Sequence, residues 1–232
     1  MNASARGWSG GPLAGLVLAL IGGTVAWGLV HFAPVFTVPA EFHIPNLGAA
    51  PERFEALEAV QAAVARRNAM VDLGLFGAVL GVMVALGQAI ERGSFKPPLA
   101  ALPIGAAGGC AAAWIGSIVH TTLDAGALAD LADTVMIHAV TCGVLGLCLG
   151  AAVAMFSTGK AVLAASVVGM AGGAMAGALY SISMSVLLPV ERADQLVPGG
   201  VISRMLWIGV FAGSLGLLIP WTLGQRNNRR EP

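Results

Sequence analysis

Long apolar stretches alternate with short polar segments along the whole chain. Six stretches contain about 20 or more mostly apolar residues, the length that a helix needs to cross the hydrocarbon core of a bilayer. They cover residues 11–32, 69–90, 99–120, 132–156, 161–188 and 203–223. The runs are continuous, whereas the strands of a membrane β-barrel alternate apolar and polar positions. The pattern therefore predicts an all-α fold: a polytopic bundle of six transmembrane helices, in one membrane domain over residues 1–232.

Composition excludes several other classes of protein. Of the 232 residues, 57% are hydrophobic and only 10% are charged, and the mean hydropathy is +0.83. A soluble domain carries about 25% charged residues, so this chain has too few charges to cover a water-exposed surface. Lys and Arg together number 12, as do Asp and Glu. The chain thus lacks the basic surplus typical of nucleic-acid binding and the polarity typical of disorder.

Basic residues are concentrated on one side of the predicted membrane. That side carries the N-terminus, residues 91–98, residues 157–160 and the tail from residue 224, with seven basic and two acidic residues, a net charge of +5. The other side has five basic and ten acidic residues, a net charge of −5. Because Lys and Arg collect in cytoplasmic segments, we expect a multi-pass protein of the plasma membrane with both termini cytoplasmic. The first stretch is longer than the apolar region of a secretion signal, so we expect it to be retained.

Every predicted span carries small residues at four-residue spacing. The third span has Gly105 and Gly109, and the fifth has Gly169, Gly173 and Gly177. Residues four apart lie on one face of a helix, and small side chains there allow two backbones in lipid to approach closely. We therefore predict that these glycines pack against other helices, of this chain or of a partner. Helix packing alone explains the pattern, so it indicates no activity.

Glycine pairs also suggest an internal repeat. Pairs at residues 22–23, 108–109 and 172–173 each lie in an odd-numbered span. On this interpretation the chain consists of three repeated helical hairpins. The alternative is that spans rich in glycine and alanine resemble one another through composition alone.

Residues 34–68 form the one sizeable segment outside the predicted membrane. Prolines at positions 34, 39 and 45 favour an extended loop in its first part. Pro51 suits the first turn of a helix, and Phe54 and Leu57 begin an apolar stripe at helical spacing. No proline interrupts residues 52–93. We therefore expect a projecting helix that continues into the second span and packs on the outer loops or on a partner; a break near residues 67–70 would refute this.

The four histidines, His31, His43, His120 and His138, all lie on or toward the predicted outer side. The third and fourth spans form a hairpin, so His120 and His138 can approach each other as ligands of haem or a metal ion. His31 and His43 are further candidate metal ligands. No His-x3-His spacing occurs, and neutral histidine is common at membrane interfaces. We therefore predict no cofactor and keep a haem or metal site as the alternative.

Motifs of enzyme active sites are absent from the sequence. The span centres also lack the Asp, Glu or Arg that ion-coupled transporters usually keep inside the bundle. Our leading hypothesis is a non-catalytic membrane subunit or accessory protein, which packs in the lipid bilayer against other membrane chains or a second copy of itself. A small permease or channel for a small solute is the first alternative. A haem- or metal-binding redox protein is the second.

Overall fold

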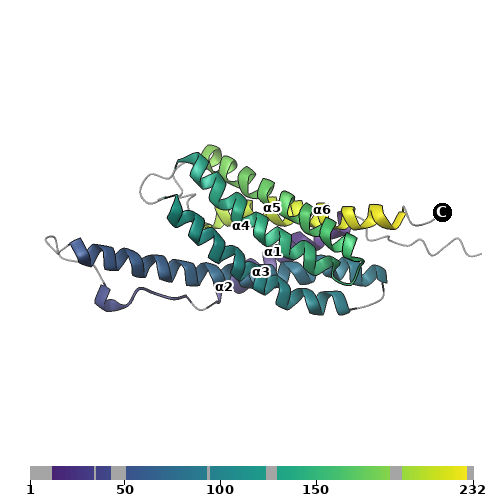
Figure 1. The fold of residues 1–232 in the computed structure, drawn as a ribbon, viewed down its shortest axis with the longest axis horizontal. Helices are drawn as coiled ribbons and strands as arrows, with labels where there is room; N and C mark the ends of the chain where they lie inside the picture. Colours follow the sequence, from purple (N-terminus) through teal and green to yellow (C-terminus); the bar gives the residue numbers. More distant parts are fainter. Residues whose placement is uncertain are drawn as a thin grey trace, which may run out of the picture.

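A computed structural model describes residues 12–33, 35–42, 51–92, 95–123, 130–188 and 195–228. Its long helices are α1 at Pro12–His31, α2 at Pro51–Arg92, α3 at Lys96–Thr122, α4 at Leu131–Ala154, α5 at Gly159–Leu187 and α6 at Val201–Asn228, and a short 3-10 helix, η1, lies at Ala40–Phe42. All six long helices contain a segment that is long and apolar enough to cross a membrane (Figure 1). The predicted all-α bundle with six spans is therefore confirmed.

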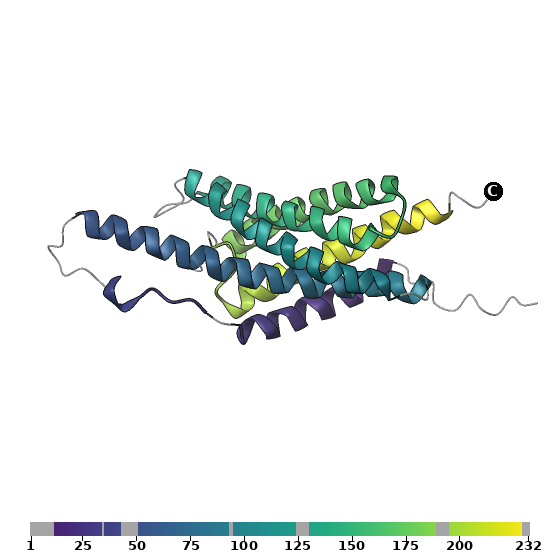
Figure 2. The ribbon, with the colours of Figure 1, turned by 60° about the horizontal axis from the view of Figure 1, so that its bottom comes forward.

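The six helices form a closed bundle with inner and outer members. Each helix contacts its neighbours in sequence, α1 also contacts α6, and α2, α4 and α6 contact one another (Figures 1 and 2). The apolar windows of α2, α4 and α6 are 56%, 56% and 50% buried, against 28%, 33% and 33% for α1, α3 and α5. The even-numbered helices are therefore the inner ones. Three equivalent hairpins would produce this alternation, and the repeat itself stays a prediction.

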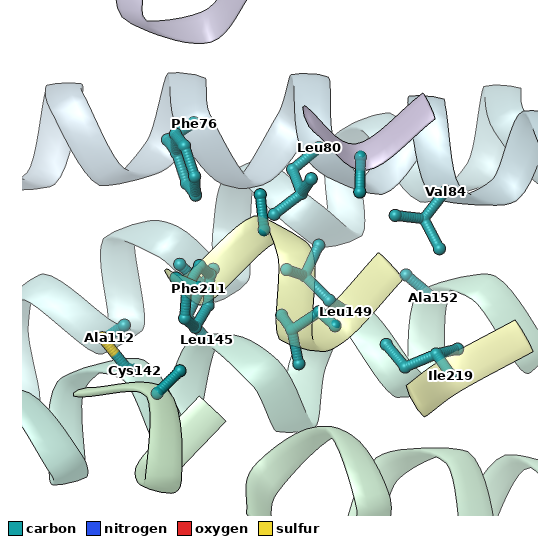
Figure 3. Packing of buried hydrophobic residues seen from close by; sticks show 14 of the residues in the cluster. Phe76, Leu80, Val84, Ala112, Cys142, Leu145, Leu149, Ala152, Phe211 and Ile219 are labelled. Carbon is teal, nitrogen blue, oxygen red and sulfur yellow. The ribbon is translucent and has the colours of Figure 1, made fainter. Parts of the chain in front are cut away.

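Large apolar side chains fill the contact between the inner helices. They are Phe76, Leu80 and Val84 from α2, Leu145 and Leu149 from α4, and Phe211 and Ile219 from α6 (Figure 3). Each of them is no more than 3% exposed. At these positions the contact between the inner helices is therefore close-packed hydrocarbon, although the same helices also bury Gln88, His138 and Thr141.

Glycines let the backbones of neighbouring helices touch. A Cβ atom added to Gly105 would collide with the backbone of Gly77 in α2, and one added to Gly109 would collide with the backbone of Leu73. At the α4–α5 contact, Gly169, Gly173 and Gly177 meet the backbones of Gly146, Cys142 and His138, respectively. All five glycines singled out in the sequence thus lie at contacts within the chain. An interface with a partner has to use other surfaces.

The second helix extends well beyond the other five. It is one continuous helix of 42 residues that passes through residues 67–70 without a break. At 1.5 Å per residue it is about 60 Å long, twice the thickness of a hydrocarbon core of about 30 Å. Its first turns project from one end of the bundle (Figures 1 and 2). We refer to residues 51–67 as the outer extension.

Candidate functional sites

The outer extension has an acidic face opposite its apolar stripe. On a helix with 3.6 residues per turn, Glu55 lies opposite Leu57, and Glu52 and Glu58 flank Glu55. All three glutamates are exposed, whereas Leu57 is half-buried. Phe54, at the edge of the acidic face, is 44% exposed. The first turns of the extension therefore present three negative charges and an aromatic side chain that no described part of the chain covers. The extension as a whole also carries three exposed arginines, Arg53 near its start and Arg66 and Arg67 at its base, so its acidic character is confined to this face of the first turns.

Asn68 fixes the base of the outer extension to the loop that follows α1. Its side-chain amide accepts a hydrogen bond from the N–H of Phe36 at 2.8 Å and donates one to the carbonyl oxygen of Phe36 at 3.0 Å. These two bonds satisfy both backbone polar groups of Phe36. Helix α2 also contacts η1. The loop is thereby tied to α2 at the point where the helix leaves the bundle.

The histidines occupy separate places in the bundle. His138 is fully buried in α4, and its ring packs edge-on against Tyr180 of α5, with the ring centroids 4.9 Å apart. His120 is half-buried near the end of α3, His31 is exposed at the end of α1, and His43 lies outside the described residues. Within the described ranges, no three His, Cys, Asp or Glu side chains gather as a metal ion would require. The geometry thus gives His138 an aromatic packing contact with α5.

A recess lies between α1, α2, α6 and the segment that precedes α6. It is lined by Trp27 and Val30 from α1, by Asp72, Leu73 and Phe76 from α2, by Val197, and by Arg204, Trp207 and Ile208 from α6. Its volume of about 20 Å³ is enough for one water-sized group. Two of its lining residues are ionisable, and ionisable residues within a transmembrane segment are costly and usually functional. The recess is therefore a candidate binding site.

Two residues of opposite charge contribute to the walls of this recess, whose accessible lining is apolar. The carboxylate of Asp72 and the guanidinium of Arg204 attract each other. The guanidinium is held in place by its Nε–H group, which donates to the carbonyl oxygen of Pro198. Arginine has five N–H donors, so this one bond leaves further donors on the same group. Helix α6 thus carries an anchored cation that attracts an anion on α2.

Aromatic rings form one wall of the recess. The ring centroids of Phe76 and Trp207 are 4.7 Å apart, and Trp207 stacks on Phe211 with an interplanar angle of 9°. Rings packed in this way hold each other in fixed positions. The recess therefore has a rigid, apolar wall.

The sequence does not reveal the recess. Asp72 and Arg204 are 132 positions apart near the ends of different spans, and no pattern indicates that their helices are neighbours. The sequence feature that could have indicated it is a pair of opposite charges near the ends of two spans, close to Trp27 and Trp207. The hydrogen bonds of Asn68 could not be predicted from the sequence either. Asn68 bonds to the backbone of Phe36, 32 residues away, and any residue type except proline could provide the same backbone groups.

Comparisons with known proteins yield no relative for this chain. No protein-family model matches it, and no curated protein or solved structure shows a significant match. Its function has to be inferred from the features described above.

Proposed function

We propose that the chain is a non-catalytic membrane subunit that docks a partner chain through the acidic face of the outer extension. The observation that carries this proposal is the unbroken α2, which holds the exposed Glu52, Glu55, Glu58 and Phe54 away from the bundle. The outer extension alone, residues 51–67, would have little helical stability in water. Here its continuation into a buried span and the hydrogen bonds of Asn68 stabilise it. A rigid arm with charges and an exposed aromatic ring is suited to recognising another protein.

The partner that fits is a different chain with a basic surface. Two copies of this chain in one membrane, inserted in the same direction, hold their extensions parallel to each other. Face to face, Glu52, Glu55 and Glu58 of one copy would meet the same residues of the other at the same height, and like charges repel. A basic partner surface, with an apolar depression for Phe54, complements the face instead.

The apolar centre supports a structural role for the bundle. Leu80, Leu145 and Leu149 fill the contact between the inner helices. A pathway for a solute would require these helices to separate and expose hydrocarbon to water, at a cost of roughly 25 cal/mol for each Å² exposed. A bundle that stays closed is suited to anchoring the outer extension.

We also propose that the chain lies in the plasma membrane with both termini cytoplasmic and the outer extension on the opposite side. The net charges of +5 and −5 on the two sides support this orientation. A cysteine that replaces the exposed Ala62 should react with a membrane-impermeant maleimide in intact cells. A cysteine fused after residue 232 should react only after the cells are opened. The opposite labelling pattern would reverse the orientation.

The docking proposal is tested by isolating the full chain from its native membrane in a mild detergent. Native mass spectrometry should show a second, different chain at fixed stoichiometry. A photo-crosslinking residue at Ala62, on the acidic face, should capture that chain. The same residue at Leu163, which is 67% exposed on the membrane-spanning part of α5, should not. Isolation as a lone monomer, or only with further copies of itself, would overturn the proposal.

Charge-changing variants test the acidic face itself. The double variant Glu55→Lys/Glu58→Lys should weaken the complex by about tenfold or more, because like charges across an interface are costly. The matched variant Glu55→Asp/Glu58→Asp keeps both charges and should retain the partner. Both variants should unfold at the temperature of the wild type, since these side chains are exposed. Retention of the partner by the lysine variant would refute docking through this face.

A further inference from the structure

We propose that the bundle opens sideways into the bilayer at the contact between α1 and α6, which we call the seam. In the open form, α1 stays with α2 and parts from α6 at the end of the bundle that carries the outer extension. The contact among the inner helices stays closed. This proposal is independent of partner docking, because the seam includes no residue of the outer extension.

The seam is one of three helix pairs that meet at equivalent residues. The pairs are α2 with α3, α4 with α5, and α6 with α1. Their central contacts are Gly77 with Gly105, Gly146 with Gly169, and Gly216 with Ala19. In the first two pairs, backbone lies against backbone. At the seam, the methyl group of Ala19 takes the place of one glycine, and a Cβ added to Gly216 would lie 2.5 Å from it.

The contact between α1 and α6 loosens toward the end that carries the outer extension. At the opposite end, Gly15 meets the backbone of Gly216. Two turns further along α1, the nearest neighbours of Gly23 are side chains of α6: a Cβ added there would lie 2.5 Å from Ile208 and 3.4 Å from Ala212. The equivalent glycines of α3 and α5 meet the backbone of α2 and α4. Side chains thus replace backbone contact in this half of the seam.

Large side chains also stand at the next turn of the seam. The α4–α5 pair has His138 and Gly177 there, with the glycine against backbone. The corresponding positions of α6 and α1 hold Ile208 and Trp27, which border the recess of about 20 Å³. Atoms that line a void lack attractive contacts on one side. This half of the seam is therefore held more weakly than the same level of the α4–α5 pair.

The order of the helices also makes the seam the weakest junction. Five of the six neighbouring pairs around the bundle are joined by a chain segment, whereas α1 and α6 are the first and last of these helices. Helix α1 has the smallest buried share, 28%, and segments with few buried contacts open at a lower free energy than the rest of a fold. Acyl chains can cover the apolar faces that part, because lipid is as apolar as these side chains.

Contacts with α2 determine which way α1 moves. A Cβ added to Gly22 would lie 2.9 Å from the side chain of Met83. Five residues after His31, the backbone of Phe36 is bonded to Asn68. Five residues span at most about 17 Å, so this bond limits how far the end of α1 can travel. Helix α1 therefore remains on α2 and leaves α6.

Double electron–electron resonance in lipid nanodiscs tests the proposal, in a background without the native cysteines. Spin labels at the exposed Leu29 of α1 and Met205 of α6 report on the seam. Labels at the exposed Met136 of α4 and Leu179 of α5, at the corresponding level, report on the matched contact. The seam should show a second, longer distance with a population of up to about 10%. The matched pair should show one distance.

Two glycine variants connect the second distance to the seam. Gly216→Ala places a Cβ 2.5 Å from the Ala19 methyl and 2.7 Å from the carbonyl oxygen of Gly15. It should raise the ratio of open to closed bundle by about tenfold. Gly224→Ala, whose Cβ would have no neighbour within 4 Å, should leave the ratio unchanged. A single seam distance in both the wild type and Gly216→Ala would overturn the proposal, as would an equal second population at the matched pair.

Thiol accessibility provides a measurement that does not depend on Gly216→Ala. Ala212 at the seam and the native Cys142 at the α4–α5 contact occupy equivalent positions, and neither is more than 1% exposed. Ala212→Cys should react with a membrane-permeant maleimide faster than Cys142 does, by the ratio of the open populations that the two label pairs give. Peptide mapping by mass spectrometry distinguishes the two thiols. An equal or lower rate at position 212 would overturn opening at the seam.

Discussion

Replacement of Gly109 by alanine should destabilise the bundle through a collision between two backbones. The added Cβ atom would lie 2.7 Å from the backbone nitrogen of Gly74 and closer still to the carbonyl group of Leu73. Ordinary van der Waals contact begins at 3.4 Å, so α3 would have to move away from α2. No rotamer change can relieve the collision, because both opposing groups are backbone. The same reasoning predicts that Leu73→Ala does not rescue the variant.

The size of this effect follows from two opposing contributions. Overpacking of a tight contact costs about 1–3 kcal/mol, and a backbone collision belongs at the upper end of this range. Alanine is favoured over glycine within a helix by about 1 kcal/mol. Gly109→Ala should therefore lower the free energy of unfolding by about 2 kcal/mol.

Two other glycines provide matched controls. A Cβ on Gly28 would have no neighbour within 4 Å, so Gly28→Ala should stabilise the chain by about 0.4–1 kcal/mol. A Cβ on Gly172 would collide with the end of the flexible Leu218 side chain, at 2.6 Å, and would touch Leu215 at an ordinary 3.8 Å. Gly172→Ala should therefore have an intermediate effect. The free energies of unfolding of the three variants are measured by equilibrium unfolding with SDS in mixed micelles. Tryptophan fluorescence monitors the unfolding. Equal stability of Gly109→Ala and Gly28→Ala would refute the reasoning.

Three further predictions concern single side chains. Asn68→Ala should release the loop, so that hydrogen exchange at the Phe36 amide accelerates by about tenfold, equivalent to one hydrogen bond of about 1.4 kcal/mol; unchanged exchange would contradict this. The carboxylate of Asp130 caps α4 by accepting a hydrogen bond from a backbone N–H at 2.9 Å. Asp130→Ala should therefore cost about 1 kcal/mol in an SDS unfolding titration, and Asp130→Asn much less. We expect the purified protein to be colourless and free of metal in absorbance and elemental measurements; a haem band that is lost in both His120→Ala and His138→Ala would instead establish the redox alternative.

The spans could be located from sequence because the bilayer imposes a length on them. The predicted stretches 132–156 and 161–188 differ by at most two residues at either end from α4 at Leu131–Ala154 and α5 at Gly159–Leu187. Hydropathy could not show which helices are inner, since lipid and the interior of a membrane protein are similarly apolar. Glycine at four-residue spacing did mark contact faces. It could not show whether Gly105 or Gly169 meets this chain or another one.

The candidate sites were harder to predict, because they depend on which helices are neighbours. Glu55 and Phe54 could be placed on a projecting helix from local spacing alone. The opposed charges of Asp72 and Arg204 require α2 and α6 to be adjacent, and no local pattern encodes this adjacency. His120 and His138 illustrate the converse: they lie on helices that pack together, yet the ring of His138 packs against Tyr180 of α5. A hairpin brings helices together without deciding which side chains meet.

The outer extension and the recess beside Asp72 are connected by α2. Asn68 and Asp72 are four residues apart and therefore lie on one side of this helix. Because the helix is unbroken, a partner that tilts the outer extension also moves the turn that carries Asp72, and so changes its distance from Arg204. A ligand of the recess whose affinity changes on docking must change partner affinity by the same factor. The continuity of α2 through residues 67–70 is thus the structural condition under which either site can influence the other.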